Sequence, residues 1–206
     1  MKRIVSFLIL LSILLNPIVS FADYQIIDNS FEYVNPKSDT LQGTTVPLIY
    51  QITNQIEVRE VDRAVRLLQK NIRIPFDFNI HIMDYSLWYT MTLGVAFDND
   101  TILLFDFLPF KSKILVHDAV SHEIGHLVYF RMTDWDKAVY KILRGIPEDW
   151  TEESEYARQP SEIFAEDFRL LFGSKYAKSL GHNNQELGDI EDIEGLRELV
   201  LNIVIR

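Results

Sequence analysis

Apolar residues recur along this chain at two spacings, one typical of strands and one typical of helices. Residues 76–82 alternate between apolar and polar, and the apolar runs 92–97 and 101–105 are separated by turn-forming residues. This pattern predicts three strands, the last two paired as a hairpin. Apolar residues at helical spacing predict helices within the segments 46–70, 114–130, 135–150, 160–173 and 190–204.

The order of these segments predicts an α+β fold. The strands precede most of the helices, so we expect a small, mostly antiparallel sheet packed on the helix of 114–130, followed by a mostly helical C-terminal half. Residues 23–45 are polar with scattered aromatic residues, and we expect an arm or a weakly ordered start there.

The first 22 residues have a pattern typical of a secretory signal peptide. Lys2 and Arg3 precede the almost wholly apolar run 4–15, and Ser20-Phe21-Ala22 is a small-x-small cleavage site. The apolar run is too short for a typical membrane span, although an uncleaved N-terminal anchor is the alternative. We therefore expect a secreted protein with no stable membrane insertion and with one domain, residues 23–206.

Composition argues against several classes of partner. The net charge of −10 becomes −12 once the signal peptide is removed, because that segment contains Lys2, Arg3 and no acid. A chain this acidic is a poor binder of nucleic acid and is repelled by anionic surfaces. It contains no cysteine, so the fold depends on its core rather than on disulfides. We expect a monomer.

The residues with the clearest chemistry are His122-Glu123-Ile124-Gly125-His126, within the helix of 114–130. Two histidines four residues apart project from one face of a helix, where their imidazoles can share one Zn²⁺. Glu123 lies about 100° further round the helix axis, where it can act as the general base for a water at the metal. This is the zincin pattern of zinc peptidases. The alternative is an amphipathic helix with two surface or interfacial histidines.

A catalytic zinc needs a third protein ligand and an open position for water. Metzincins supply the ligand from a longer motif with Gly and His, but this chain has Tyr129 and Met132 at those positions. Gluzincins take a Glu from a later helix, and the candidate is Glu162, at the start of the helix of 160–173. Glu166 projects from the same face and would accept a hydrogen bond from a ligand histidine. An ordinary solvated acidic face is the alternative for this pair.

The zinc motif, Tyr156 and one downstream run together resemble a known family. The run is Glu162-Ile163-Phe164-Ala165-Glu166-Asp167-Phe168-Arg169-Leu170-Leu171. The combination is similar to the catalytic domain of anthrax lethal factor and to the small secreted clostridial Pro-Pro endopeptidases that share this domain. The resemblance is close over about residues 117–173 and loose elsewhere.

The resemblance implies a gluzincin-type zincin fold with one zinc per chain. It implies that His122, His126 and Glu162 are the zinc ligands, that Glu123 is the general base and that Glu166 is the carboxylate behind a ligand histidine. Tyr156 matches the active-site tyrosine of the family, although it lies six residues before Glu162 and the family has about seven. An ordinary half-buried loop tyrosine is the alternative.

We therefore expect a secreted zinc endopeptidase that hydrolyses peptide bonds of protein substrates. In zincins an exposed edge strand binds the extended peptide by β-augmentation, and the resemblance implies that this strand is Thr101–Phe105, which precedes the zinc helix. A core strand without a substrate role is the alternative. For the whole protein, the alternatives are a secreted zinc-binding toxin or adhesion module without peptidase activity and an interaction domain with a fortuitous motif. The intact Glu123 favours the peptidase.

Overall fold

A computed structural model describes residues 24–28, 58–84, 93–106, 112–190 and 193–205. The expected signal peptide, residues 1–22, and the first part of the helix expected within 46–70 lie outside the described residues. The described elements are β1 (Tyr24–Asp28), α2 (Val58–Gln69), β2 (Phe78–Asp84), β3 (Gly94–Phe97), β4 (Thr101–Asp106), α3 (Lys113–Arg131), α4 (Asp134–Arg144), α5 (Pro160–Phe172) and α6 (Leu196–Ile205), with short 3₁₀ turns η4 (Tyr156–Arg158) and η5 (Ala177–Ser179).

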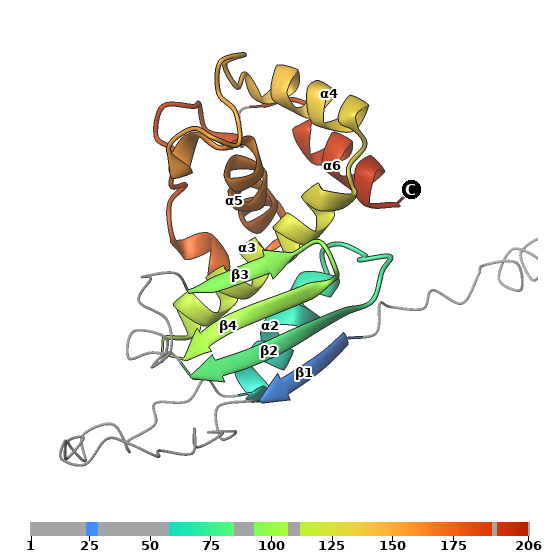
Figure 1. The fold of residues 1–206 in the computed structure, drawn as a ribbon, viewed down its shortest axis with the longest axis vertical. Helices are drawn as coiled ribbons and strands as arrows, with labels where there is room; N and C mark the ends of the chain where they lie inside the picture. The colour runs from blue at the N-terminus through green and yellow to red at the C-terminus, as the bar shows by residue number, and fades with distance from the viewer. Residues whose placement is uncertain (1–23, 29–57, 85–92, 107–111, 191–192, 206) are drawn as a thin grey trace, which may run out of the picture.

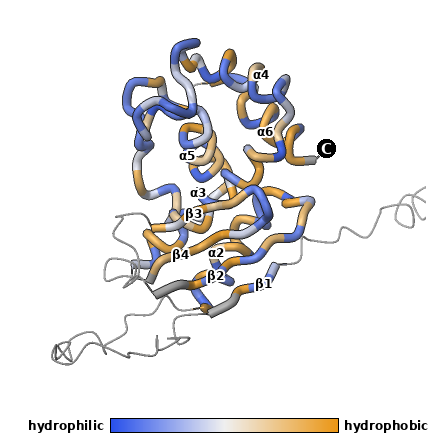
Figure 2. The backbone as a smooth tube through the Cα atoms, viewed as in Figure 1, coloured by the Kyte–Doolittle hydropathy of each residue, from blue (hydrophilic) through white to orange (hydrophobic). Residues whose placement is uncertain are grey.

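The predicted α+β class is confirmed. Figure 1 shows the sheet in the lower half of the molecule with α2 behind it, and α4, α5 and α6 gathered above. The long helix α3 runs from behind the sheet into the helical part, and it packs on α2, on β3 and on α5. Figure 2 shows that apolar residues concentrate where these layers meet, whereas the outer loops of the helical part are hydrophilic. The site of interest is therefore carried by a helix that both parts enclose.

The expectation of a mostly antiparallel sheet is wrong. Within the described residues the strand order is β1-β2-β4-β3, and β1–β2 and β2–β4 are parallel, so that only β3–β4 is antiparallel. β1 and β2 can be parallel because α2 lies between them in the chain, and a connection of this length allows a parallel partner. β2 and β4 can be parallel because β3 lies between them in the chain and runs antiparallel to β4. The predicted hairpin of β3 and β4 is confirmed, with Phe97 opposite Thr101.

The placement of Thr101–Phe105 at the sheet edge is also wrong. β4 contains this segment and pairs with β2 on one side and β3 on the other, so both of its backbone edges are occupied. The strand at the sheet margin nearest α3 is β3, which packs directly on that helix. The sequence predicted the pairing of β4 with β3 but gave no partner for the other side of β4, which pairs with β2.

The N-terminal arm expected at 23–45 contains a strand at its start. β1 pairs with β2 in register from Tyr24 opposite Phe78, and the two rings stack with centroids 5.8 Å apart. The Tyr24 hydroxyl also donates to Asp62 of α2 at 2.6 Å. These contacts hold β1 against the core, which the composition of the arm alone did not predict.

The four later helices were predicted, and the structure corrects their ends. α4 ends at Arg144 rather than near Pro147, because Gly145 adopts a left-handed conformation with φ of 74° and closes the helix. α6 begins at Leu196, six residues later than the apolar pattern suggested. Among the described residues, no helix combines the length and the apolar character that crossing a membrane requires.

Candidate metal centre

The helix that carries the histidine motif is enclosed over most of its length. Every residue of α3 from Val116 to Tyr129 is buried except Asp118, which is partly exposed. His122 and His126 retain only 6% and 8% of their accessible surface. Of the alternative of surface or interfacial histidines, the surface form therefore does not describe this chain. Two polar imidazoles buried side by side require polar or metal partners.

Those partners come from α5, which crosses α3 at very close range. A methyl group added to Gly125 would lie 2.8 Å from the Cα atom of Ala165, a distance that would force the helices apart. The small residues at this crossing allow the backbones to approach, and Glu162 and Glu166, on the same helix as Ala165, then lie against the histidines. Gly125, which lies between the two histidines of the motif, thus sets the separation of α3 and α5.

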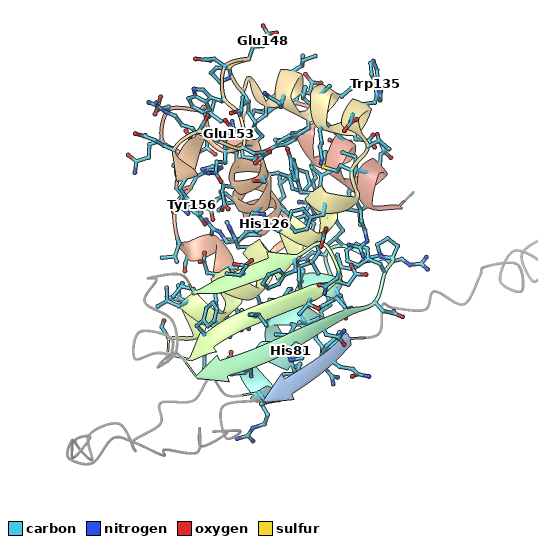
Figure 3. The ribbon with its side chains drawn as sticks, in the orientation of Figure 1. His81, His126, Trp135, Glu148, Glu153 and Tyr156 are labelled. Atoms are coloured by element: carbon cyan, nitrogen blue, oxygen red, sulfur yellow. The ribbon has the colours of Figure 1, made fainter. Side chains whose placement is uncertain are left out.

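His122, His126 and Glu162 form a buried group that could hold a metal ion. The two Nε2 atoms lie 3.1 Å apart, and the Glu162 oxygens lie 3.1 Å from His122 Nε2 and 3.4 Å from His126 Nε2. The ring of His126 stacks on Phe130 with centroids 6.1 Å apart, which limits its rotation. In Figure 3, His126 lies where the helical part meets the sheet, and Tyr156 also lies in the helical part, above the sheet. His81 lies on β2, well apart from this group (Figure 3).

Glu166 lies behind His122, as the sequence predicted. Its Oε1 is 2.8 Å from His122 Nδ1, which fixes the ring with Nε2 turned toward the other two members of the group. Its Oε2 accepts from Arg169 Nη2 at 2.6 Å and from the Asn183 backbone at 3.2 Å. The solvated-face alternative for Glu162 and Glu166 is therefore incorrect, since both carboxylates are directed into the protein.

Arg169 holds Glu166 in place behind His122. Its side chain is 1% exposed, and its Nε lies 3.0 Å from Asp118 of α3. Its terminal nitrogens donate to Glu166 and to the backbone carbonyls of Ala177, Leu180 and Gly181. A guanidinium offers five donors in a rigid fork, and these contacts engage every nitrogen of the group. Arg169 thus joins the loop after α5 to the carboxylate that orients His122.

Glu123 is separate from the three-residue group and faces β3. Its carboxylate hydrogen-bonds to the backbone of Ala96 and is only 6% exposed. A methyl group on Gly94 would lie 2.8 Å from Glu123 Cγ, so the glycine leaves the space that the side chain occupies. Burial raises the pKa of the Glu123 carboxyl, and the nearby histidines oppose the shift. A carboxylate held beside the group, with a raised pKa, suits a general base.

Tyr156 lies in η4, one short turn before α5, and its hydroxyl hydrogen-bonds to Glu162. The missing residue before Glu162 therefore does not remove the tyrosine from the site. Although the residue is 57% exposed, desolvation of its hydroxyl raises the pKa of Tyr156, and the hydrogen bond to Glu162 adds to the shift. The phenol stays protonated and can act as a donor.

The electrostatics of the group favour positive charge. Burial disfavours a charged His122, but the carboxylates of Glu162 and Glu166 outweigh it and raise the pKa of His122 to about 10. Burial likewise opposes the ionised form of Glu166, yet His122 and Arg169 hold its pKa at about 2. The pKa of Glu162 is lowered too, against burial, by the two histidines. A cation between these side chains would meet the same stabilising field, and it would compete with the proton.

Sequence reasoning missed the residues that support the site. Asp118 is one helical turn before His122, and Arg169 is three residues after Glu166. The available signal was the group Glu166, Asp167 and Arg169 between the apolar residues of α5, because a buried guanidinium needs carboxylate partners. Asn183 and Gly94 carry no comparable signal, since they contribute through the backbone and through the absence of a side chain.

Comparisons with known proteins do not identify this chain: no family model, no curated protein and no solved structure matches it.

Proposed function

We propose that this protein is a secreted zinc endopeptidase of gluzincin type. The observation that carries the proposal is the geometry of His122, His126 and Glu162. A tetrahedral zinc with ligands at about 2.0–2.1 Å has neighbouring ligand atoms about 3.3 Å apart. The two Nε2 atoms lie 3.1 Å apart, one Glu162 oxygen lies 3.1 Å from His122 Nε2 and the other lies 3.4 Å from His126 Nε2, and these spacings are close to those that a single zinc requires. Two imidazoles and one carboxylate are also a ligand set that catalytic zinc prefers.

The residues around this group suit peptide hydrolysis. When bound, zinc polarises a peptide carbonyl and lowers the pKa of water toward about 7. Glu123 accepts the proton of the attacking water and passes it to the nitrogen of the departing amine. The Tyr156 hydroxyl donates a hydrogen bond to the oxyanion of the tetrahedral intermediate. Glu166 and Arg169 hold His122 in position throughout.

The strand that could align a peptide is β3 rather than β4. It lies at the margin of the described sheet and packs on α3, and Glu123 contacts it at Gly94 and Ala96. A peptide paired with its outer edge would pass directly beside the general base. This arrangement keeps the proposed mode of substrate binding and moves it by one strand.

Cleavage profiling on a proteome-derived peptide library tests this function. The purified protein should cut a reproducible set of peptide bonds, a metal chelator should stop the cleavage, and stoichiometric Zn²⁺ should restore it. Zinc binding with no cleavage at any peptide would instead support the non-proteolytic zinc module.

The Tyr156→Phe variant tests the role of the hydroxyl. Removing one oxyanion donor typically lowers kcat by about 10²–10³-fold. We expect a loss of this order in steady-state kinetics on a peptide from the profile, with zinc content and KM nearly unchanged. Unchanged kcat would contradict the assignment and make His182 the next donor to test, since it lies near Tyr156 and Glu162.

A further inference from the structure

A cavity of about 370 Å³ opens beside the proposed catalytic residues. Its walls come from α3, from Leu93 and Gly94 at the start of β3, from Tyr156 and Glu166, and from the Asn183 loop; the α3 residues are Asp118, Ala119 and Glu123. His122 also borders the cavity, whereas His126 does not, so the cavity lies toward the N-terminal end of α3 relative to His126. The cavity is therefore part of the proposed active site, and the mechanism above assigns no part of the substrate to this space.

The position of Glu123 decides which part of a substrate would enter the cavity. Glu123 delivers a proton to the departing amine, so the residue that begins with that amine must lie against Glu123. A cavity that shares a wall with Glu123 is therefore placed to receive the side chain of that residue, the one after the scissile bond.

Carboxyl groups outnumber basic groups among the described residues that line the cavity, where Asp118, Glu123 and Glu166 face the single basic side chain of His122. Asp118 and Glu166 both border it and both contact Arg169, so two carboxylates share one guanidinium. No lysine or arginine is among the described residues that line the cavity. The Asp118 side chain is 17% exposed, and the partial burial raises the pKa of its carboxyl to about 6. A carboxylate in these surroundings would be stabilised by a cationic group brought in by a ligand.

We propose that this cavity binds the side chain of the residue after the scissile bond and that Asp118 selects a lysine or arginine there. The inference rests on the proposed peptidase function and adds its substrate class. Asp118 lies four residues before His122, about 6 Å along the helix axis. A lysine or arginine side chain is long enough to span that distance from a backbone held at the metal group. The acidic chain as a whole, with its net charge of −10, would also attract basic segments.

The test compares wild-type protein with Asp118→Asn on the peptide library and on paired synthetic peptides. The paired peptides carry lysine or its uncharged isostere norleucine after the scissile bond. For the wild type we expect enrichment of lysine and arginine at that position and a kcat/KM about 10- to 100-fold higher for lysine, the range of a hydrogen bond to a charged group. In Asp118→Asn the ratio should fall to about threefold or less, while the norleucine peptide is cut at a similar rate.

The controls separate this inference from the function on which it rests. Glu148→Gln removes one negative charge from an exposed position at the far end of the helical part and should leave the lysine preference unchanged (Figure 3). Asp118→Asn should still bind zinc, because the amide oxygen can accept from Arg169. Wild-type cleavage without lysine or arginine enrichment would overturn the inference alone, and this comparison needs no variant to fold. A preference that persists in Asp118→Asn would also overturn it, whereas no wild-type cleavage at all would overturn the function.

Discussion

Glu123→Gln is expected to lower peptide cleavage by about 10²–10⁴-fold, the range of general acid–base catalysis, while the variant keeps its metal and its fold. The reason is that Glu123 lies outside the three-residue metal group and contacts β3 instead. Its carboxyl is buried with a raised pKa, so a neutral amide of the same shape fits its surroundings. The change removes the proton acceptor and little else.

The measurement pairs kcat/KM on a library-derived peptide with zinc content and thermal unfolding of the same preparation. A variant that loses zinc together with activity would show that Glu123 is a ligand or a structural residue. A variant that cuts peptide at the wild-type rate would place the general base elsewhere.

Glu162→Gln is expected to leave the site nearly empty of zinc, whereas Glu166→Gln should weaken zinc binding or activity by about 10–100-fold. Glu162 supplies the only carboxylate within the metal-binding group, and an amide is a much poorer zinc ligand. Glu166 contacts His122 only through Nδ1, on the side of the ring away from the group. Glutamine is preferred to alanine at position 166 because alanine would leave Arg169 buried without its closest carboxylate.

Zinc titration by calorimetry with a competing chelator distinguishes the two variants. They are matched controls for each other, since the same chemical change is made one helical turn apart on α5. The reverse ranking would mean that Glu166 is the ligand and that α5 binds the metal one turn further along.

The sequence predicted most of the metal centre because helical geometry is local. Two histidines four residues apart on an uninterrupted helix must project together, and so must Glu162 and Glu166. The meeting of the two helices was not local, and it depends on Gly125 and Ala165, which carry no charge and no chemistry of their own. The network of Asp118 and Arg169 likewise depends on which charged side chains the crossing encloses.

The sheet shows the opposite case. The alternation within 76–82 and the turn at 98–100 predicted strands correctly, because both signals are short-range. The order β1-β2-β4-β3 depends on pairings between residues far apart in the chain, such as Tyr24 with Phe78. Apolar patterns do not distinguish which strand lies at the margin, so the expectation that β4 lies beside the substrate rested on the resemblance and on its place just before the zinc helix.

The zinc content of the purified protein tests the central claim most directly. After saturation with Zn²⁺ and exhaustive dialysis, elemental analysis should find about one zinc per chain, as a three-ligand site requires, and His126→Ala should lose it. Zinc well below one per chain in the wild type, or full retention in His126→Ala, would contradict the assignment of His122, His126 and Glu162 as a zinc centre.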